Sequence, residues 1–121
     1  MAINRIVVGN EYIVGRLSDG RPAVRTAVRT IQNGEVMIDF DGIQYHISGL
    51  KCCPPSYRLR KKSTFVIKKP ENLWNFNRTI EWANAMNSYD GKVIKLRDAI
   101  IEYDYVIYGP WHFSRDWLIP A

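Results

Sequence analysis

Closely spaced turn signals in the first half of the chain constrain its fold more than any other feature. Ser18-Asp19-Gly20, Asn33-Gly34 and Asp41-Gly42 each separate short stretches that are rich in β-branched residues. Asn33-Gly34 is the strongest of these signals, because the favoured two-residue hairpin turn needs positive φ at both central positions. Apolar and polar side chains alternate over residues 36–40 and again over 43–47. The pattern predicts a meander of strands about five residues long, which is typical of small β-barrels.

A proline pair predicts where this first β unit ends. Pro54-Pro55 cannot donate hydrogen bonds to a strand ladder, so we expect the sheet to stop there. The sequence after it is strongly basic, with only a brief strand candidate within it. We therefore predict an N-terminal small barrel at 1–55, a basic connector at 56–70, and a C-terminal part at 71–121.

The C-terminal part begins with a helical pattern. Apolar residues at a spacing near 3.6, without Gly or Pro, predict one short α-helix near residues 78–88, and Asp90-Gly91 ends it. Three strand candidates follow, at 93–96, 103–108 and 111–113. This part therefore combines a helix with a second small barrel.

An internal echo links the ends of the two halves. Residues 45–48 read Tyr-His-Ile-Ser and residues 111–114 read Trp-His-Phe-Ser. In each half the motif follows a turn glycine and is followed by a leucine and then a proline. A duplicated small barrel would explain the echo, and chance could also produce a match of this length.

The C-terminal half resembles small bacteriophage-encoded proteins. The matching residues are Trp82, Met86, Tyr89, Gly91, Tyr105, Ile107, Trp111, Phe113, Asp116, Trp117 and Leu118. In that family, such a segment precedes an SH3-like or chromo-like barrel, and residues 8–14 of this chain are similar to the opening of KOW-type barrels. The resemblance implies a mainly β fold, with two small SH3-like barrels in tandem or one elaborated barrel and a single short α-helix. It also implies a phage-derived protein in the cytoplasm of a bacterial host.

The positive charge of the chain is concentrated in its middle. Residues 1–41 carry five basic and five acidic side chains, and residues 71–121 carry five basic and seven acidic ones. Residues 42–70 contain no acidic side chain and seven basic ones. Cations this closely spaced repel one another, and a polyanion or an acidic protein surface would relieve that repulsion.

The leading hypothesis is a non-catalytic module that binds nucleic acid through segment 51–69. Its cations would contact phosphates, and the nearby tyrosine would stack on bases. The candidate binding residues are Lys51, Tyr57, Arg58, Arg60, Lys61, Lys62, Lys68 and Lys69. The alternative for the same segment is a solvated linker without a partner.

The second hypothesis is a protein-interaction factor that binds, inhibits or redirects a host nucleic-acid-handling protein. Aromatic residues concentrate binding energy at protein interfaces, so Trp74, Phe76 and Trp117 are the candidates if they are exposed. The alternative is that they belong to a core, since aromatic residues dominate small cores.

The motifs of catalysis are missing from this sequence. No nucleophile, base and orienting group recur at diagnostic spacing, so we expect no enzyme and no cofactor. Cys52-Cys53 and two histidines lack the spacing of a zinc site, so we expect no metal. No apolar run approaches the about 20 residues of a membrane span, and the N-terminus does not read as a signal peptide. The oligomeric state is left open.

Overall fold

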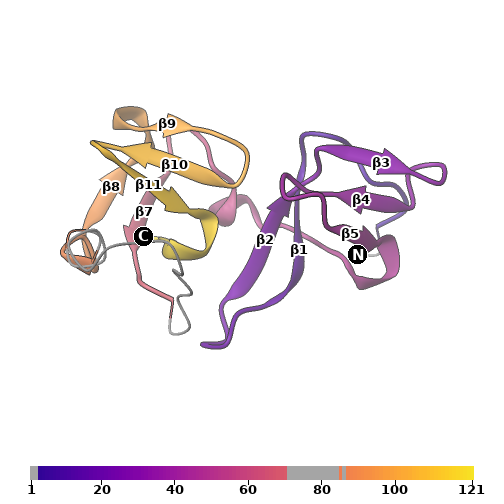
Figure 1. Cartoon of the computed structure of the whole chain (residues 1–121), viewed down its shortest axis with the longest axis horizontal. Helices are drawn as coiled ribbons and strands as arrows, with labels where there is room; N and C mark the ends of the chain where they lie inside the picture. The colour runs from indigo at the N-terminus through magenta and orange to yellow at the C-terminus, as the bar shows by residue number, and fades with distance from the viewer. Residues whose placement is uncertain (1–2, 71–84, 86) are drawn as a thin grey trace. The chain divides into compact units, whose positions relative to one another are not determined.

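The computed structural model describes residues 3–70, 85 and 87–121, and divides the chain into two compact units (Figure 1). We call Met1–Arg58 the N-terminal unit and Leu59–Ala121 the C-terminal unit. Both are built from short antiparallel strands joined by tight turns and short 3-10 segments. The prediction of a mainly β protein is confirmed.

The N-terminal unit contains two three-stranded antiparallel sheets, with strand orders β2-β1-β6 and β3-β4-β5. Its strands are β1 (Glu11–Arg16), β2 (Pro22–Thr26), β3 (Arg29–Ile31), β4 (Val36–Ile38), β5 (Gln44–His46) and β6 (Lys51–Cys52). The turn between β3 and β4 has four residues rather than two, and its φ values are positive at Gln32 (52°), Asn33 (60°) and Gly34 (83°). Asn33-Gly34 therefore marks the turn correctly but not its length.

A 3-10 turn connects the two sheets of the N-terminal unit. It is η1 (Ile47–Gly49), between β5 and β6, and the His46 ring accepts a hydrogen bond from the Ser48 backbone N–H at 3.2 Å. A second such turn, η2 (Pro55–Tyr57), follows β6 and the proline pair. The core of this unit is formed by Ile6, Tyr12, Ala27, Met37 and Leu50.

The C-terminal unit also contains two three-stranded antiparallel sheets, with strand orders β12-β7-β8 and β11-β10-β9. Its strands are β7 (Thr64–Ile67), β8 (Val93–Lys95), β9 (Ile100–Ile101), β10 (Tyr105–Tyr108), β11 (Trp111–Ser114) and β12 (Leu118–Pro120). Two 3-10 turns, η3 (Leu96–Asp98) and η4 (Arg115–Trp117), follow β8 and β11. Its core is formed by Phe65, Ile67, Ile94, Leu96, Ala99, Val106, Phe113, Trp117 and Leu118.

The two units share one pattern of strand order and strand pairing. In each, the first strand lies between the second and the last, the third to fifth strands form the other sheet, and a 3-10 turn precedes the last strand. Met37 pairs with Tyr45 in one unit, and Val106 pairs with Phe113 at the equivalent place in the other. The sequence echo instead aligns Tyr45 with Trp111. The sequence alignment is therefore displaced by two residues from the structural one, which matches Tyr45 with Phe113. A displacement of two residues keeps every side chain on the same face of the strand.

Three predictions differ from the structure or fall outside it. The predicted connector at 56–70 is not a separate segment, because β7 lies within it and pairs with both β8 and β12, so the boundary between units follows Arg58. Among the described residues, none of the sheets closes into a barrel. The helix predicted near 78–88 lies almost wholly outside the described residues and stays a prediction.

Candidate nucleic-acid interface

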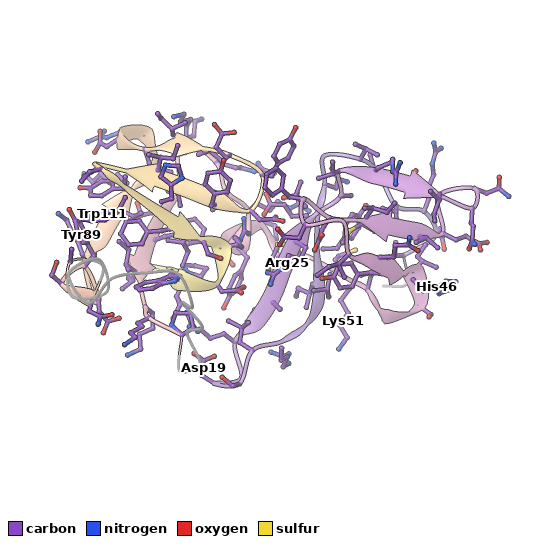
Figure 2. All side chains as sticks on the ribbon, viewed as in Figure 1. Asp19, Arg25, His46, Lys51, Tyr89 and Trp111 are labelled. Atoms are coloured by element: carbon purple, nitrogen blue, oxygen red, sulfur yellow. The ribbon has the colours of Figure 1, made fainter. Side chains whose placement is uncertain are left out.

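The basic segment does not form one continuous feature of the structure. The N-terminal unit contains Lys51 on β6, Tyr57 in η2, and Arg58. Lys51 is exposed (Figure 2), whereas Tyr57 and Arg58 are half-buried. The C-terminal unit contains the other five predicted cations, which are Arg60, Lys61, Lys62, Lys68 and Lys69. All five are exposed.

Strand β7 separates those five cations into two groups. Residues 60–62 precede it, and residues 68–69 follow it. An extended chain rises about 3.3 Å per residue, so Lys62 and Lys68, which flank β7, lie up to about 20 Å apart. Cations at that separation do not contact the same phosphate, and each group has to be considered with its own neighbours.

The group at the start of β7 gains two cations from distant sequence. The Leu96 backbone N–H donates to the Ser63 carbonyl at 3.0 Å, and Thr64 pairs with Lys95 on β8. The Lys61 ammonium donates to the Ala99 carbonyl at 2.7 Å. These bonds bring η3 and the end of β8 against the turn before β7. We call the resulting exposed cluster the basic edge, formed by Arg60, Lys61, Lys62, Lys95 and Arg97.

The basic edge retains most of its capacity for anions. Lys61 uses one of the three donors of its ammonium group on the Ala99 carbonyl, which leaves two. Asp98, in η3, is the acidic side chain beside it in sequence. Five cations next to one carboxylate leave a net positive surface that matches a chain of phosphates.

The other end of β7 is more balanced electrostatically. The Lys69 backbone N–H donates to the Asp90 carboxylate at 2.7 Å, which places that carboxylate beside the two lysines. Lys92 follows in sequence, and its ammonium lies 5.2 Å from the ring centroids of both Tyr89 and Tyr108. Figure 2 shows Tyr89 on this unit. The Asp90 carboxylate and the two rings near Lys92 thus offset part of the positive charge at this end.

The predicted protein-interaction residues do not form a described surface. Trp117 is only 3% exposed and packs edge-on against Phe113, with ring centroids 5.8 Å apart. It therefore belongs to the core, which is the alternative that the sequence left open, and it fails the condition of exposure. Trp74 and Phe76 lie outside the described residues.

Sequence reasoning missed Lys95 and Arg97. Lys95 falls in a predicted strand, and its outward direction follows from the alternation of exposed Val93, buried Ile94 and exposed Lys95. Its nearness to Lys62 could not be read from the sequence, because that nearness depends on which strand pairs with β8.

A buried carboxylate organises the β4–β5 turn of the N-terminal unit. Asp39 is 2% exposed and accepts hydrogen bonds from the backbone N–H groups of Asp41 and Ile43, both at 2.9 Å. The Tyr45 hydroxyl donates to its other oxygen at 3.1 Å. These contacts serve the turn itself, so we interpret Asp39 as a structural residue.

This arrangement predicts a pH dependence at alkaline pH. Burial raises the pKa of the Tyr45 phenol above its ordinary value of 10.0, the Asp39 carboxylate raises it further, and Arg25 opposes both. The protonated phenol is therefore favoured in the folded state. The stability that it contributes is complete below about pH 10 and is lost as the pH rises through the raised pKa.

The Tyr45→Phe variant tests this pH dependence. We expect the free energy of unfolding of the wild type to fall above about pH 10, and to fall less steeply in the variant. Urea unfolding followed by circular dichroism at a series of pH values measures both slopes. Tyr103→Phe, at a tyrosine that is 50% exposed, is the matched control and should keep the wild-type slope. Equal slopes in Tyr45→Phe and the wild type would contradict the prediction.

The comparisons with known proteins return no relatives. The chain matches no protein-family model, no curated protein and no solved structure at a significant level.

Within the part of the chain that the structure describes, no helix is long and apolar enough to span a bilayer. The same residues contain no group of three or more His, Cys, Asp or Glu side chains that could hold a metal ion. Neither Cys52, which is exposed, nor Cys53, which is buried, forms a disulfide.

Proposed function

We propose that this protein is a non-catalytic nucleic-acid-binding module whose contact surface is the basic edge of the C-terminal unit. The observation that carries the proposal is the convergence of Lys95 and Arg97 on Arg60–Lys62 through the β7–β8 pairing and the Ser63–Leu96 hydrogen bond. Cations that the fold brings together from two separate segments repel one another and cannot move apart as those along a solvated chain can. They therefore have the greater need of an anionic partner.

The fold proposal accompanies the functional one. Each unit has five or more short strands in two small sheets, with a 3-10 turn before the last strand. We propose that the units are two SH3-like small barrels in tandem, and the resemblance in the C-terminal half supports a phage-derived protein acting in a bacterial host. Such modules bind by loops and sheet edges, which is where the basic edge lies.

Salt-dependent binding tests the proposal. Neutralisation of phosphates releases counterions, so the logarithm of affinity should fall linearly with the logarithm of salt concentration. We expect measurable binding of fluorescent oligonucleotides at about 50 mM salt, and a loss of at least tenfold at about 200 mM. Binding that is absent at both concentrations would refute the proposal.

A pair of charge-reversal variants locates the surface. Lys62→Glu combined with Lys95→Glu should weaken binding at least tenfold and reduce the salt slope by about two, or about one per phosphate contact. The matched control combines Lys68→Glu with Lys69→Glu, which changes the net charge equally at the other end of β7. A distance of about 20 Å exceeds the screening length at physiological salt, so its effect should be much smaller. Equal losses in both pairs would contradict the basic edge as the surface.

An acidic protein that imitates nucleic acid is the alternative partner for the same surface. Capture of a defined bacterial protein from nuclease-treated lysate, abolished by Lys62→Glu with Lys95→Glu, would favour this alternative. Under the leading proposal, nuclease treatment abolishes capture.

A further inference from the structure

The outer face of the β9-β10-β11 sheet carries an aromatic and apolar surface. Val106 and Phe113 are fully buried on the inner face, so alternation places their neighbours on the outer one. The strand register aligns Ile100 with Ile107 and Ile107 with His112 in one row. We call this surface the outer face, formed by Ile100, Tyr105, Ile107, His112 and Ser114.

Two rings on the outer face are stacked. The Tyr105 and His112 rings lie nearly parallel, at 11°, with centroids 5.5 Å apart. Tyr105 is half-buried and His112 is exposed, so the imidazole lies toward solvent on a tyrosine that supports it. Ile100, which is 57% exposed, extends the apolar surface beside this pair. An exposed ring that stacks on a second ring through one face can stack on a third ring, such as a nucleic-acid base, through its other face.

The outer face is continuous with the basic edge. Strand β9 begins one residue after Ala99, whose carbonyl accepts the Lys61 ammonium at 2.7 Å, and Arg97 precedes it in η3. The end of the face that holds Ile100 is therefore cationic. At the other end, the Glu102 backbone N–H donates to the Tyr105 carbonyl, so an exposed acidic side chain lies there. The outer face therefore has a cationic end at Ile100 and an acidic end at Glu102.

From this geometry we infer that the ligand is single-stranded nucleic acid, with a base stacked on His112 and its phosphates at Lys61 and Arg97. The inference rests on the proposed function and specifies its substrate class. Only an unpaired strand presents bases that can stack on a protein ring while its backbone follows a row of cations. A duplex keeps its bases stacked on one another and would use the basic edge alone.

Single-stranded and duplex oligonucleotides of matched length test the inference on the full chain. We expect the single strand to bind at least about tenfold more tightly at equal salt. His112→Ala should weaken single-strand binding about tenfold and leave the salt slope unchanged, since stacking releases no counterions. His112→Phe should restore binding and His112→Leu should not, because a flat ring is what the site requires. Val93→Ala, at an exposed apolar residue of the β12-β7-β8 sheet, is the control and should bind as the wild type does.

The outcomes separate this inference from the proposed function. Equal affinity for single strand and duplex, or wild-type binding by His112→Ala, overturns the inference and leaves the function standing if the salt slope persists. Absence of binding to either oligonucleotide overturns both. Glu102→Gln supplies an independent check. Removal of the acidic group beside Tyr105 should strengthen single-strand binding about twofold. Weaker binding would contradict the orientation in which the phosphates lie at Lys61 and Arg97, away from Glu102.

Discussion

Replacement of Phe113 by alanine should lower the free energy of unfolding of the C-terminal unit by about 3–5 kcal/mol. Phe113 is 0% exposed and lies on the inner face of β11, opposite Val106. Its ring packs edge-on against Tyr89 at 5.4 Å and Trp117 at 5.8 Å. The substitution removes both ring contacts and leaves a cavity that the short strands around it cannot fill.

Tryptophan fluorescence provides a selective measurement of this loss. All four tryptophans of the chain, at positions 74, 82, 111 and 117, belong to the C-terminal unit. Urea unfolding followed at this signal should therefore show the full shift in midpoint. The matched control is Val93→Ala in the same unit, since Val93 is 55% exposed, and it should cost less than about 1 kcal/mol. A comparable loss in the two variants would contradict the assignment of Phe113 to the core.

The second large effect is expected at Asp39, whose replacement by alanine should cost about 3 kcal/mol in the N-terminal unit. The carboxylate is 2% exposed and is the acceptor for the backbone N–H groups of Asp41 and Ile43 and for the Tyr45 hydroxyl. Alanine leaves all three donors without this acceptor, and hydrogen bonds to a charged group contribute about 1.5–3 kcal/mol each. Hydrogen exchange at the Asp41 and Ile43 amides should accelerate together with the loss of global stability.

Two variants control the Asp39 experiment. Asp39→Asn keeps a carbonyl oxygen that can accept one bond, so its loss should lie between those of the wild type and Asp39→Ala. Asp41→Ala removes an exposed carboxylate two residues away and should change stability by less than about 0.5 kcal/mol. If Asp39→Ala also changes the free energy of unfolding by less than about 0.5 kcal/mol, the carboxylate does not organise the turn.

Local sequence signals predicted much of the fold. Asn33-Gly34 and Asp41-Gly42 predict turns because few residue types accept positive φ, and Gly34 and Gly42 have φ values of 83° and 82°. Alternation in residues 93–95 predicts which side chains face the core, since the period of a strand is two. Such signals operate within a few residues, so they need no knowledge of the partner strand.

The domain boundary was predicted less well because strand pairing is not local. Thr64–Ile67 looked like part of a connector, since charged residues flank it on both sides. β8 and β12 pair with it from far along the chain, and Phe65 and Ile67 are 0% exposed because they pack in the core that residues from those distant segments complete. A short strand in a basic stretch becomes a central strand only when those partners are present.

The candidate site shows the same division between local and tertiary information. The concentration of positive charge between residues 42 and 70 can be read from the sequence alone, and it is the basis for proposing a polyanionic partner. Which of those cations lie together follows from the pairing of the strands. Lys62 precedes β7 and Lys68 follows it, so the extended strand, which rises about 3.3 Å per residue, separates them. Pairing with β8 places Lys95 opposite Thr64, two residues from Lys62, because hydrogen bonds between strands connect residues irrespective of their distance along the chain.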